Sequence, residues 1–364
     1  MTNKKICFVS LVNIYLLPYL KKYTTLIGDN YDIIYWNRHN IDEKINQNRH
    51  PYERTISENA SKLSKLFGYI GFSLFARKIL KKNKYDYIVL LSTNSGMFLW
   101  ATLMRKYKRK FVLDIRDYTY ENNRLFYYLE KKLIHNSNFT VISSEGFRTF
   151  LPVSDYFIAH NELNISKEVI LEFRSREKGN VRQYILTYIG LIRFHEQNKK
   201  IIDVFMNDSR FLIQFIGADA LYLEEYVKSK KATNIILIDR FEPKETFKLL
   251  KNTDFILNLY GNKTPLLDYA LSNKLYYSAK LGIPILVCPK TYMSEISNKY
   301  KFGFDVDLTE QREHIKNTII SFYKDIIWED FYQHCDSFLN LVQHESELLD
   351  NKIRDVFECD NIDK

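Results

Sequence analysis

The side chains with the clearest chemistry lie in residues 254–287, where a strand, a loop and a helix are expected to follow one another. Ser272 fits the N-cap of that helix, Asn273 and Lys274 open it, and Gly282 ends it. The first turn of a helix presents free backbone N–H groups and a positive dipole end, and the Lys274 ammonium adds a full charge. Such a helix start can hold a phosphate group. An ordinary α/β helix with a capping serine and a surface lysine fits the spacing equally well.

A second basic side chain follows the strand expected at residues 184–189. That strand runs into Gly190, and Arg193 lies just past its end. A guanidinium group is well suited to bidentate contact with phosphate oxygens. Taken alone, the simpler interpretation is a strand-ending glycine followed by a solvated arginine.

Polar side chains also gather at a strand end in the first half of the chain. The buried strand expected at residues 110–115 delivers Asp114, Arg116 and Asp117 to its carboxyl end. One carboxylate could accept a proton from a substrate hydroxyl, which makes all three residues catalytic candidates. A structural Asp–Arg ion pair that caps the following loop explains the pattern equally well. His160, at another strand end, is an acceptor-side candidate, although a lone histidine is more often structural.

The elements that position these residues alternate between apolar runs of strand length and helical stretches. The runs are continuous, which is typical of strands buried on both faces of a parallel sheet. Strands are predicted at 6–11, 31–36, 87–91, 110–115, 139–142 and 156–159, and again at 184–189, 211–216, 234–238, 254–259, 284–287 and 302–306. The alternation predicts an α/β fold of two Rossmann-like parallel-sheet domains that face each other across a cleft, with ligand sites at the carboxyl ends of strands.

A charged, polar stretch at residues 166–182 separates the two series and is predicted to be a linker. The predicted domains are therefore one Rossmann-like domain at 1–165 and a second at 183–325. A helical tail at 326–364 is expected to pack back on the first domain. A length of 364 residues suits two domains.

Composition restricts the class of partner. The net charge is +9 and aromatic residues make up 15 % of the chain, which suits an anionic substrate or surface. No nucleic-acid-binding motif accompanies these features, so no nucleic-acid partner is expected.

The four cysteines form no CxxC pair and are expected to be reduced thiols in the cytoplasm. No apolar run approaches the roughly 20 residues of a spanning helix, so we do not expect an integral membrane protein.

Residues 61–84 form a basic, aromatic segment that contains no acidic residue. Such a segment suits the anionic inner face of the plasma membrane, as a peripheral contact. A core helix of the first domain with a solvated basic end explains it slightly better.

The second half resembles a known family of enzymes. The segments IGLIRFHEQNKKIIDVF (189–205) and NKLYYSAKLGIPILV (273–287), with two strands between them, are similar to the donor-binding domain of GT-B glycosyltransferases. The resemblance is to family-4-like enzymes of bacterial capsule and exopolysaccharide synthesis in particular. It implies an acceptor-binding domain at 1–165 and a nucleotide-sugar-binding domain at 183–325. It also implies that Arg193 and Lys274 clamp the diphosphate of the nucleotide sugar. The donor-binding candidates beside them are Gly190, Ser272 and Asn273.

One departure from the family pattern concerns two glutamates eight positions apart. Here Tyr269 and Tyr277 occupy those places. In the family the second glutamate usually holds the ribose, and a tyrosine hydroxyl can also hydrogen-bond a sugar hydroxyl. Tyr277 is therefore a donor-binding candidate, and Asp268 is a nearby carboxylate that could substitute.

The resemblance implies a hexosyltransferase-type enzyme that moves a sugar from a nucleotide-sugar donor to a glycan or a polyprenyl-diphosphate-linked acceptor. It also implies retention of the anomeric configuration. Fixed cations take the place of a metal in such enzymes, so no cofactor and no essential metal are expected. The one tight Asp-x-Asp pair, Asp305 and Asp307, is interpreted as structural.

Two other functions remain open. A sugar-nucleotide epimerase of the same architecture would need several acid/base side chains around one sugar, and the second half shows no histidine–carboxylate cluster. A non-catalytic GT-B-like partner protein would explain the missing glutamates.

Overall fold

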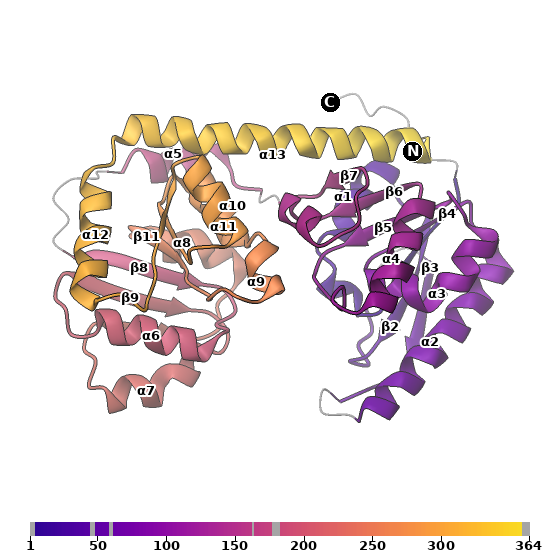
Figure 1. Ribbon diagram of the computed structural model, residues 1–364, viewed down its shortest axis with the longest axis horizontal. Coiled ribbons are helices and arrows are strands. Elements are labelled where there is room, and N and C mark those ends of the chain that lie inside the picture. The colour runs from indigo at the N-terminus through magenta and orange to yellow at the C-terminus, as the bar shows by residue number, and fades with distance from the viewer. Residues whose placement is uncertain (1–3, 44–47, 58–60, 162–163, 177–182, 359–364) are drawn as a thin grey trace. The chain divides into compact units, whose positions relative to one another are not determined.

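The computed structural model describes residues 4–43, 48–57, 61–161, 164–176 and 183–358 (Figure 1). Contacts divide the chain into two compact units. The N-terminal unit comprises Met1–His160 and His344–Lys364, and the C-terminal unit comprises Asn161–Gln343. Each unit contains its own parallel sheet and its own hydrophobic core, so each is described separately.

The N-terminal unit is built on a seven-stranded parallel sheet in the order β3-β2-β1-β4-β5-β6-β7. Chain order reverses between β1 and β4, as in doubly wound nucleotide-binding folds. The strands are β1 (Ile6–Ser10), β2 (Tyr31–Asn37), β3 (Asn48–Glu53), β4 (Tyr87–Leu90), β5 (Phe111–Ile115), β6 (Phe139–Ile142) and β7 (Tyr156–Ile158). All but β3 are almost fully buried, which agrees with their continuous apolar runs.

Several helices of this unit begin where the sequence supplies a capping side chain. Ser61 accepts a hydrogen bond from the backbone of Ser64, Ser92 from that of Ser95, and Asn123 from two following residues. The helices are η1 (Ile14–Leu16), α1 (Leu20–Ile27), α2 (Lys62–Asn83), α3 (Thr93–Lys106), α4 (Arg124–Asn136) and η2 (Glu145–Thr149).

The C-terminal unit has a six-stranded parallel sheet in the order β10-β9-β8-β11-β12-β13, with its own reversal between β8 and β11. Its strands are β8 (Tyr184–Ile189), β9 (Phe211–Ile216), β10 (Ile235–Ile238), β11 (Phe255–Asn258), β12 (Ile285–Val287) and β13 (Gly303–Asp305). Alternate residues of β11 enter two different hydrophobic clusters, Phe255 and Leu257 one and Ile256 the other. Because successive side chains point to opposite faces of a strand, helices cover both faces of this sheet.

The helices of the C-terminal unit follow its strands in turn. They are α5 (Lys167–Arg174), α6 (His195–Phe205), η3 (Ala220–Leu223), α7 (Glu224–Ser229), η4 (Pro243–Glu245), α8 (Thr246–Leu250), α9 (Pro265–Tyr269), α10 (Asn273–Leu281), α11 (Tyr292–Lys299) and α12 (Arg312–Lys324).

The last helix, α13 (Trp328–Phe357), contributes to both cores. Its first half places Phe331 and Phe338 in a cluster of the C-terminal unit. Its second half places Leu349 and Ile353 in the core of the N-terminal unit. The division between the two units therefore falls within this helix.

The fold prediction of two Rossmann-like parallel sheets with C-terminal helices is confirmed, and two local predictions are wrong. Strand β3 was not expected, because this partly exposed edge strand is polar and contains Pro51. Part of the predicted linker is helix α5, which Ser166 caps and whose Phe173 is buried beside α10. Residues 177–182 of that linker lie outside the described residues.

Candidate anion-binding pocket

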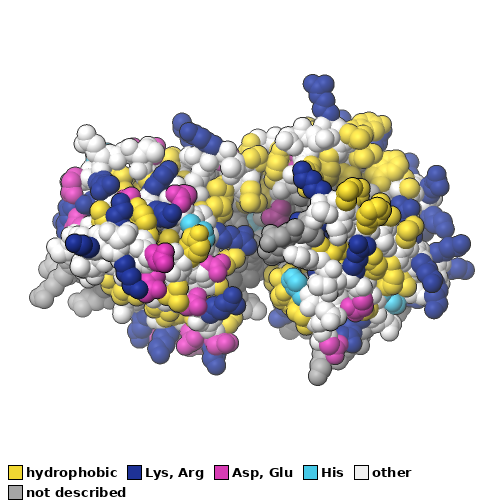
Figure 2. All heavy atoms as spheres, turned by 90° about the horizontal axis from the view of Figure 1, so that it is seen from below, with side chains coloured by type: hydrophobic (Ala, Val, Ile, Leu, Met, Phe, Trp, Pro, Cys, Tyr) yellow, Lys and Arg dark blue, Asp and Glu magenta, His cyan; other side chains and the backbone are white. Residues whose placement is uncertain are grey.

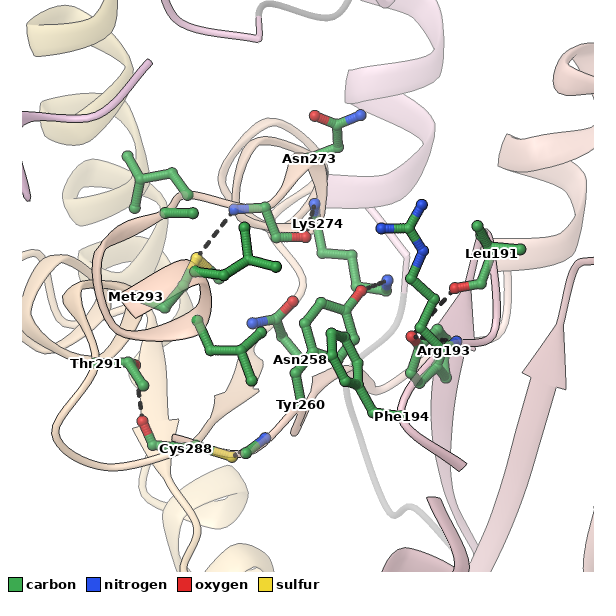
Figure 3. A pocket seen from close by; sticks show the side chains of 18 of the residues that line it. Leu191, Arg193, Phe194, Asn258, Tyr260, Asn273, Lys274, Cys288, Thr291 and Met293 are labelled. Carbon is green, nitrogen blue, oxygen red and sulfur yellow. Dashed lines mark hydrogen bonds between the residues drawn. The ribbon is translucent and has the colours of Figure 1, made fainter. Parts of the chain in front are cut away.

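A pocket of about 420 Å³ opens in the C-terminal unit at the carboxyl ends of β8 and β11 (Figure 3). These are the adjacent strands between which the strand order reverses, and ligands of doubly wound sheets bind at such a point. The lining contains two cationic side chains, Arg193 and Lys274, and no carboxylate. The pocket is therefore suited to an anion.

The turn that follows β8 forms one wall of this pocket. Gly190 has a backbone φ of +110°, a conformation that a side chain would strain. Its carbonyl oxygen packs so tightly against Gly217 that a Cβ there would lie 1.8 Å from it. Two glycines thus let the ends of β8 and β9 approach each other and bring the following loop to the pocket.

Arg193 lies on this loop with a fixed backbone and a free side chain. Its N–H donates to the Tyr188 hydroxyl at 3.3 Å, and its carbonyl accepts from the Asn198 side chain at 2.7 Å. The exposed guanidinium has no hydrogen bond or ion pair with the residues that the structure describes. Figure 3 shows this side chain on the same side of the pocket as Lys274. Its five donors remain available for a ligand.

Lys274 lies in the first turn of α10, where the predicted helix start is found. Ser272 is the N-cap, and its hydroxyl accepts from the backbone N–H of Lys274 at 3.3 Å. Although Lys274 is only 5 % exposed, none of the described carboxylates forms an ion pair with it. Burying a cation without an anion is unfavourable, so a ligand that supplies the negative charge would stabilise this position.

Two tyrosines hold the Lys274 ammonium in place. The ammonium donates to the Tyr260 hydroxyl and lies 4.2 Å from the centre of the Tyr188 ring. Burial alone would raise the pKa of Tyr260, but the Lys274 charge and hydrogen bonds from its neighbours outweigh it and lower that pKa. Burial raises the pKa of Tyr188, which stays neutral. The two rings therefore orient the cation, and neither supplies a carboxylate to pair with it.

Three further residues of this pocket were missed by the sequence interpretation. Tyr188 and Asn258 belong to adjacent strands, and Tyr260 follows the second of them. The side-chain oxygen of Asn258 is buried and has no hydrogen-bond partner among the described residues, so it can accept from a ligand hydroxyl or N–H group. Their places at the carboxyl ends of predicted strands were the available signal, but the sequence does not show which strand ends lie together.

The other donor-binding candidates divide into two groups. Gly190, Ser272, Asn273 and Tyr277 line the pocket together with Arg193 and Lys274. Tyr277 packs edge to face on Phe247, with 6.3 Å between ring centres, and burial raises its pKa.

Asp268 lies outside the lining. Its carboxylate accepts the backbone N–H of Lys263 at 2.8 Å, so in this structure it shapes the loop before α9.

The catalytic candidates of the N-terminal unit form an internal ion pair. Asp114 is fully buried at the end of β5, and Nε of Arg116 lies 2.5 Å from its Oδ1. Its Oδ2 accepts hydrogen bonds from Arg116 at 2.9 Å and from the Tyr23 hydroxyl at 2.7 Å. Arg116 also donates to the carbonyl of Ala159 at 3.1 Å. This geometry is what the structural alternative predicts, because both charges are satisfied within the protein.

Asp117 and His160 are placed differently. Asp117 is exposed just past β5. His160 is largely buried, and its Nε2 lies 2.5 Å from a carboxylate oxygen of Glu345 on α13.

No group of side chains suited to a metal ion occurs among the residues that the structure describes. Asp305 accepts hydrogen bonds from Ser294 and Asn298, and Asp307 accepts from Thr309. Cys7, Cys288 and Cys335 are buried, and Cys359 lies outside the described residues. Within the described part of the chain, none of the helices combines the length and apolar character needed to cross a membrane.

The whole chain is similar to solved structures of one architecture, the GT-B fold. Sucrose-phosphate synthase from Thermosynechococcus elongatus has a TM-score of 0.67 at 12 % identity, covering 98 % of this chain and 100 % of that one. HepE of Anabaena, in complex with UDP and glucose, has a TM-score of 0.63 at 12 % identity, with 95 % and 99 % covered. WaaG, a glycosyltransferase involved in lipopolysaccharide biosynthesis, has a TM-score of 0.63 at 11 % identity, with 96 % and 99 % covered.

Neither a protein-family model nor the sequence of a curated protein matches the chain. At identities this low, similarity to solved structures shows the fold alone. This chain is thus a protein of the GT-B fold with two Rossmann-like units, and its C-terminal unit carries a cationic pocket at the point where strand order reverses.

Proposed function

We propose that the chain is a glycosyltransferase whose C-terminal unit binds the diphosphate of a nucleotide-sugar donor. The observation that carries the proposal is the Lys274 ammonium, which is buried in a pocket without a carboxylate. A buried cation that no protein anion neutralises calls for an anionic ligand. Arg193, at the same pocket with no partner among the described residues, supplies a second positive charge.

The same geometry suits the chemistry of sugar transfer. Breaking the bond between the sugar and the diphosphate develops negative charge on the leaving phosphate oxygen. Fixed cations and the N–H groups at the start of α10 stabilise that charge without having to reorganise. We therefore propose that Lys274 and Arg193 act on the leaving group and that the reaction needs no metal.

The remaining polar lining is suited to the nucleoside and the sugar. Asn258 offers an unsatisfied side-chain oxygen, and Tyr277 offers a hydroxyl where related enzymes have a glutamate. We propose that Tyr277 contacts the ribose.

The acceptor and pathway rest on the sequence resemblance to family-4-like enzymes. We propose a glycan or lipid-linked saccharide acceptor, a role in cell-surface polysaccharide synthesis on the cytoplasmic side of the membrane, and retention of configuration. Among the similar structures, HepE is in complex with UDP and glucose and WaaG is involved in lipopolysaccharide biosynthesis, which supports a nucleotide-sugar donor.

The test is a binding screen followed by an activity assay. Thermal shift with UDP, GDP, dTDP and CMP sugars identifies the donor, and release of the nucleoside diphosphate then reports turnover. Lys274→Ala and Arg193→Ala should each lower turnover by about 100-fold or more, since each removes a charge that stabilises the transition state. Lys299→Ala, which changes an exposed lysine of the same unit outside the pocket, is the control.

Three outcomes would contradict the proposal. Absence of binding to every sugar nucleotide would favour a non-catalytic partner protein. Interconversion of the donor sugar without an acceptor would favour an epimerase. Near-normal turnover in both pocket variants would show that Lys274 and Arg193 do not act on the diphosphate.

A further inference from the structure

Helix α2 of the N-terminal unit is apolar on two opposite faces. One face is buried and carries Gly68, Phe72, Ala76 and Leu80 at intervals of four residues. This face belongs to the core of the unit, as expected for a helix that covers a sheet. The core helix considered as one interpretation of residues 61–84 is therefore present.

Close packing fixes how the helix is rotated about its axis. A Cβ at Gly68 would lie 2.4 Å from the Trp36 ring of β2, so only glycine allows this approach. Phe72 stacks on the same tryptophan, with 6.1 Å between ring centres. The residues on the opposite side of α2 are thereby held toward solvent.

That opposite side carries a row of large apolar side chains. Leu63, Leu66, Phe67, Ile70 and Leu74 are 67 %, 49 %, 62 %, 45 % and 60 % exposed. Their spacing of i, i+3, i+4, i+7 and i+11 aligns them along one helix face. We refer to these five residues as the α2 stripe. A contiguous exposed apolar row of this kind marks an interaction surface.

Basic side chains continue and flank the α2 stripe. Arg77, Lys78 and Lys81 follow Ile70 and Leu74 at helical spacing on the same face, and all three are exposed. Further basic residues of the segment are Lys62, Lys65, Lys82 and Lys84. Figure 2 shows hydrophobic side chains gathered on one face of this unit, bordered by Lys and Arg at the side where Figure 1 places α2.

The charge pattern distinguishes between the possible occupants of this surface. In a two-fold dimer the same patch meets itself, and because both ends of α2 are basic, parallel and antiparallel pairings would both oppose like charges. An anionic bilayer offers hydrocarbon to the apolar row and headgroups to the lysines. The helix of 22 residues would lie along the surface over roughly 33 Å.

We propose that the exposed face of α2 docks the protein on an anionic lipid bilayer, with the α2 stripe in the headgroup–acyl boundary and the basic residues at the phosphates. The proposal does not depend on the transferase activity, because the surface belongs to the N-terminal unit and binds without a donor. If the acceptor is lipid-linked, docking brings the enzyme to the surface that holds it.

The experiment is co-sedimentation of the full chain with vesicles, without nucleotide, at low and high salt. Vesicles containing phosphatidylglycerol should bind the protein at low salt, and vesicles of phosphatidylcholine alone should not. The charge variant Lys78→Glu, Lys81→Glu and Lys82→Glu should lower partitioning by at least about tenfold. The stripe variant Leu63→Ser, Phe67→Ser and Leu74→Ser should lower it comparably and should also reduce the binding that remains at high salt.

Matched controls change the same number of exposed residues elsewhere in the chain. The charge control is Lys108→Glu, Lys131→Glu and Lys132→Glu, and the stripe control is Leu125→Ser, Leu171→Ser and Ile327→Ser. Both should bind vesicles far better than the α2 variants. Because the substituted side chains are exposed, each variant should unfold at the temperature of the wild type.

Any of four results would overturn the proposal. They are equal partitioning of the α2 variants and their controls, equal binding to both vesicle types, no vesicle binding, and a dimer in analytical ultracentrifugation that the stripe variant abolishes. Calorimetry with a nucleotide sugar tests the transferase proposal separately, because that measurement needs no vesicles.

Discussion

The strand orders of the two units follow the same pattern. The units differ in whether the protein itself neutralises a buried charge near the carboxyl edge of the sheet. In the N-terminal unit, Asp114 is neutralised by Arg116 and hydrogen-bonded by Tyr23. In the C-terminal unit, Lys274 has two tyrosines around it and no carboxylate partner among the described residues. A charge that the protein satisfies itself supports the fold, whereas one that it only orients is available to a ligand.

The largest expected effect is a loss of stability when the buried ion pair of the N-terminal unit is broken. Asp114→Ala leaves the Arg116 guanidinium buried without its anion, and we expect a loss of about 3–5 kcal/mol in the free energy of unfolding. Urea denaturation of the variant measures this loss. The control is Asp117→Ala, which alters an exposed carboxylate three residues along and should change stability little. A stable Asp114→Ala protein that has lost only turnover would instead make Asp114 catalytic.

A second buried acid in this unit gives a prediction about pH. Burial, reinforced by the nearby Glu121, raises the pKa of Glu130 to about 8 from an ordinary value of 4.5. Between these values the folded protein retains a proton that the unfolded chain has lost, so stability should fall as pH rises, by about 1.4 kcal/mol per unit at most.

Glu130→Gln leaves an amide oxygen that can accept the hydrogen bond from Thr93, and it removes the group that titrates. The difference in unfolding free energy between variant and wild type should therefore grow in the variant's favour from pH 5 to pH 8. Thermal unfolding across that range measures it, and parallel curves for the two proteins would contradict the prediction.

The smallest effect concerns how Lys274 is oriented. Tyr260→Phe keeps the ring and removes the hydroxyl that accepts from the ammonium, and we expect about tenfold weaker binding of the nucleoside diphosphate. Tyr222→Phe, at an exposed ring of the same unit, is the control.

Because the pKa of Tyr260 is lowered, its phenolate forms below the ordinary value of 10.0 and then competes with the ligand for the ammonium. Wild-type affinity should therefore decrease as pH rises toward that value, and calorimetry should show no such step for Tyr260→Phe. The same step in both proteins would assign it to another group.

Much of the fold follows from the sequence because the buried strands are long apolar runs with clear ends. Strands β6, β8 and β9 lie at the residues predicted, and so does the start of α10 at Asn273. Strand β3 was missed because a polar edge strand gives a weak pattern. Helix α5 was missed because its eight residues lie within a charged, polar stretch. These two elements are held by tertiary contacts that no local pattern encodes.

The site was predictable where local spacing fixes it and not where partners come from distant strands. The N-cap at Ser272 and the turn at Gly190 are local features. Asp114 lies only two residues before Arg116, so their ion pair could be proposed from the sequence. That no described carboxylate lies beside Lys274 depends on how the strands are ordered in the C-terminal sheet. Tyr188, Tyr260 and Asn258 were missed for that reason.

The measurement that tests the central claim most directly combines calorimetry and thermal unfolding of Lys274→Met. The substitution replaces a buried, unneutralised cation by an apolar side chain of similar length. We expect the affinity for the nucleoside diphosphate to fall by about 100-fold or more while the unfolding temperature stays the same or rises. Unchanged affinity together with a lower unfolding temperature would show that Lys274 supports the fold and not a ligand.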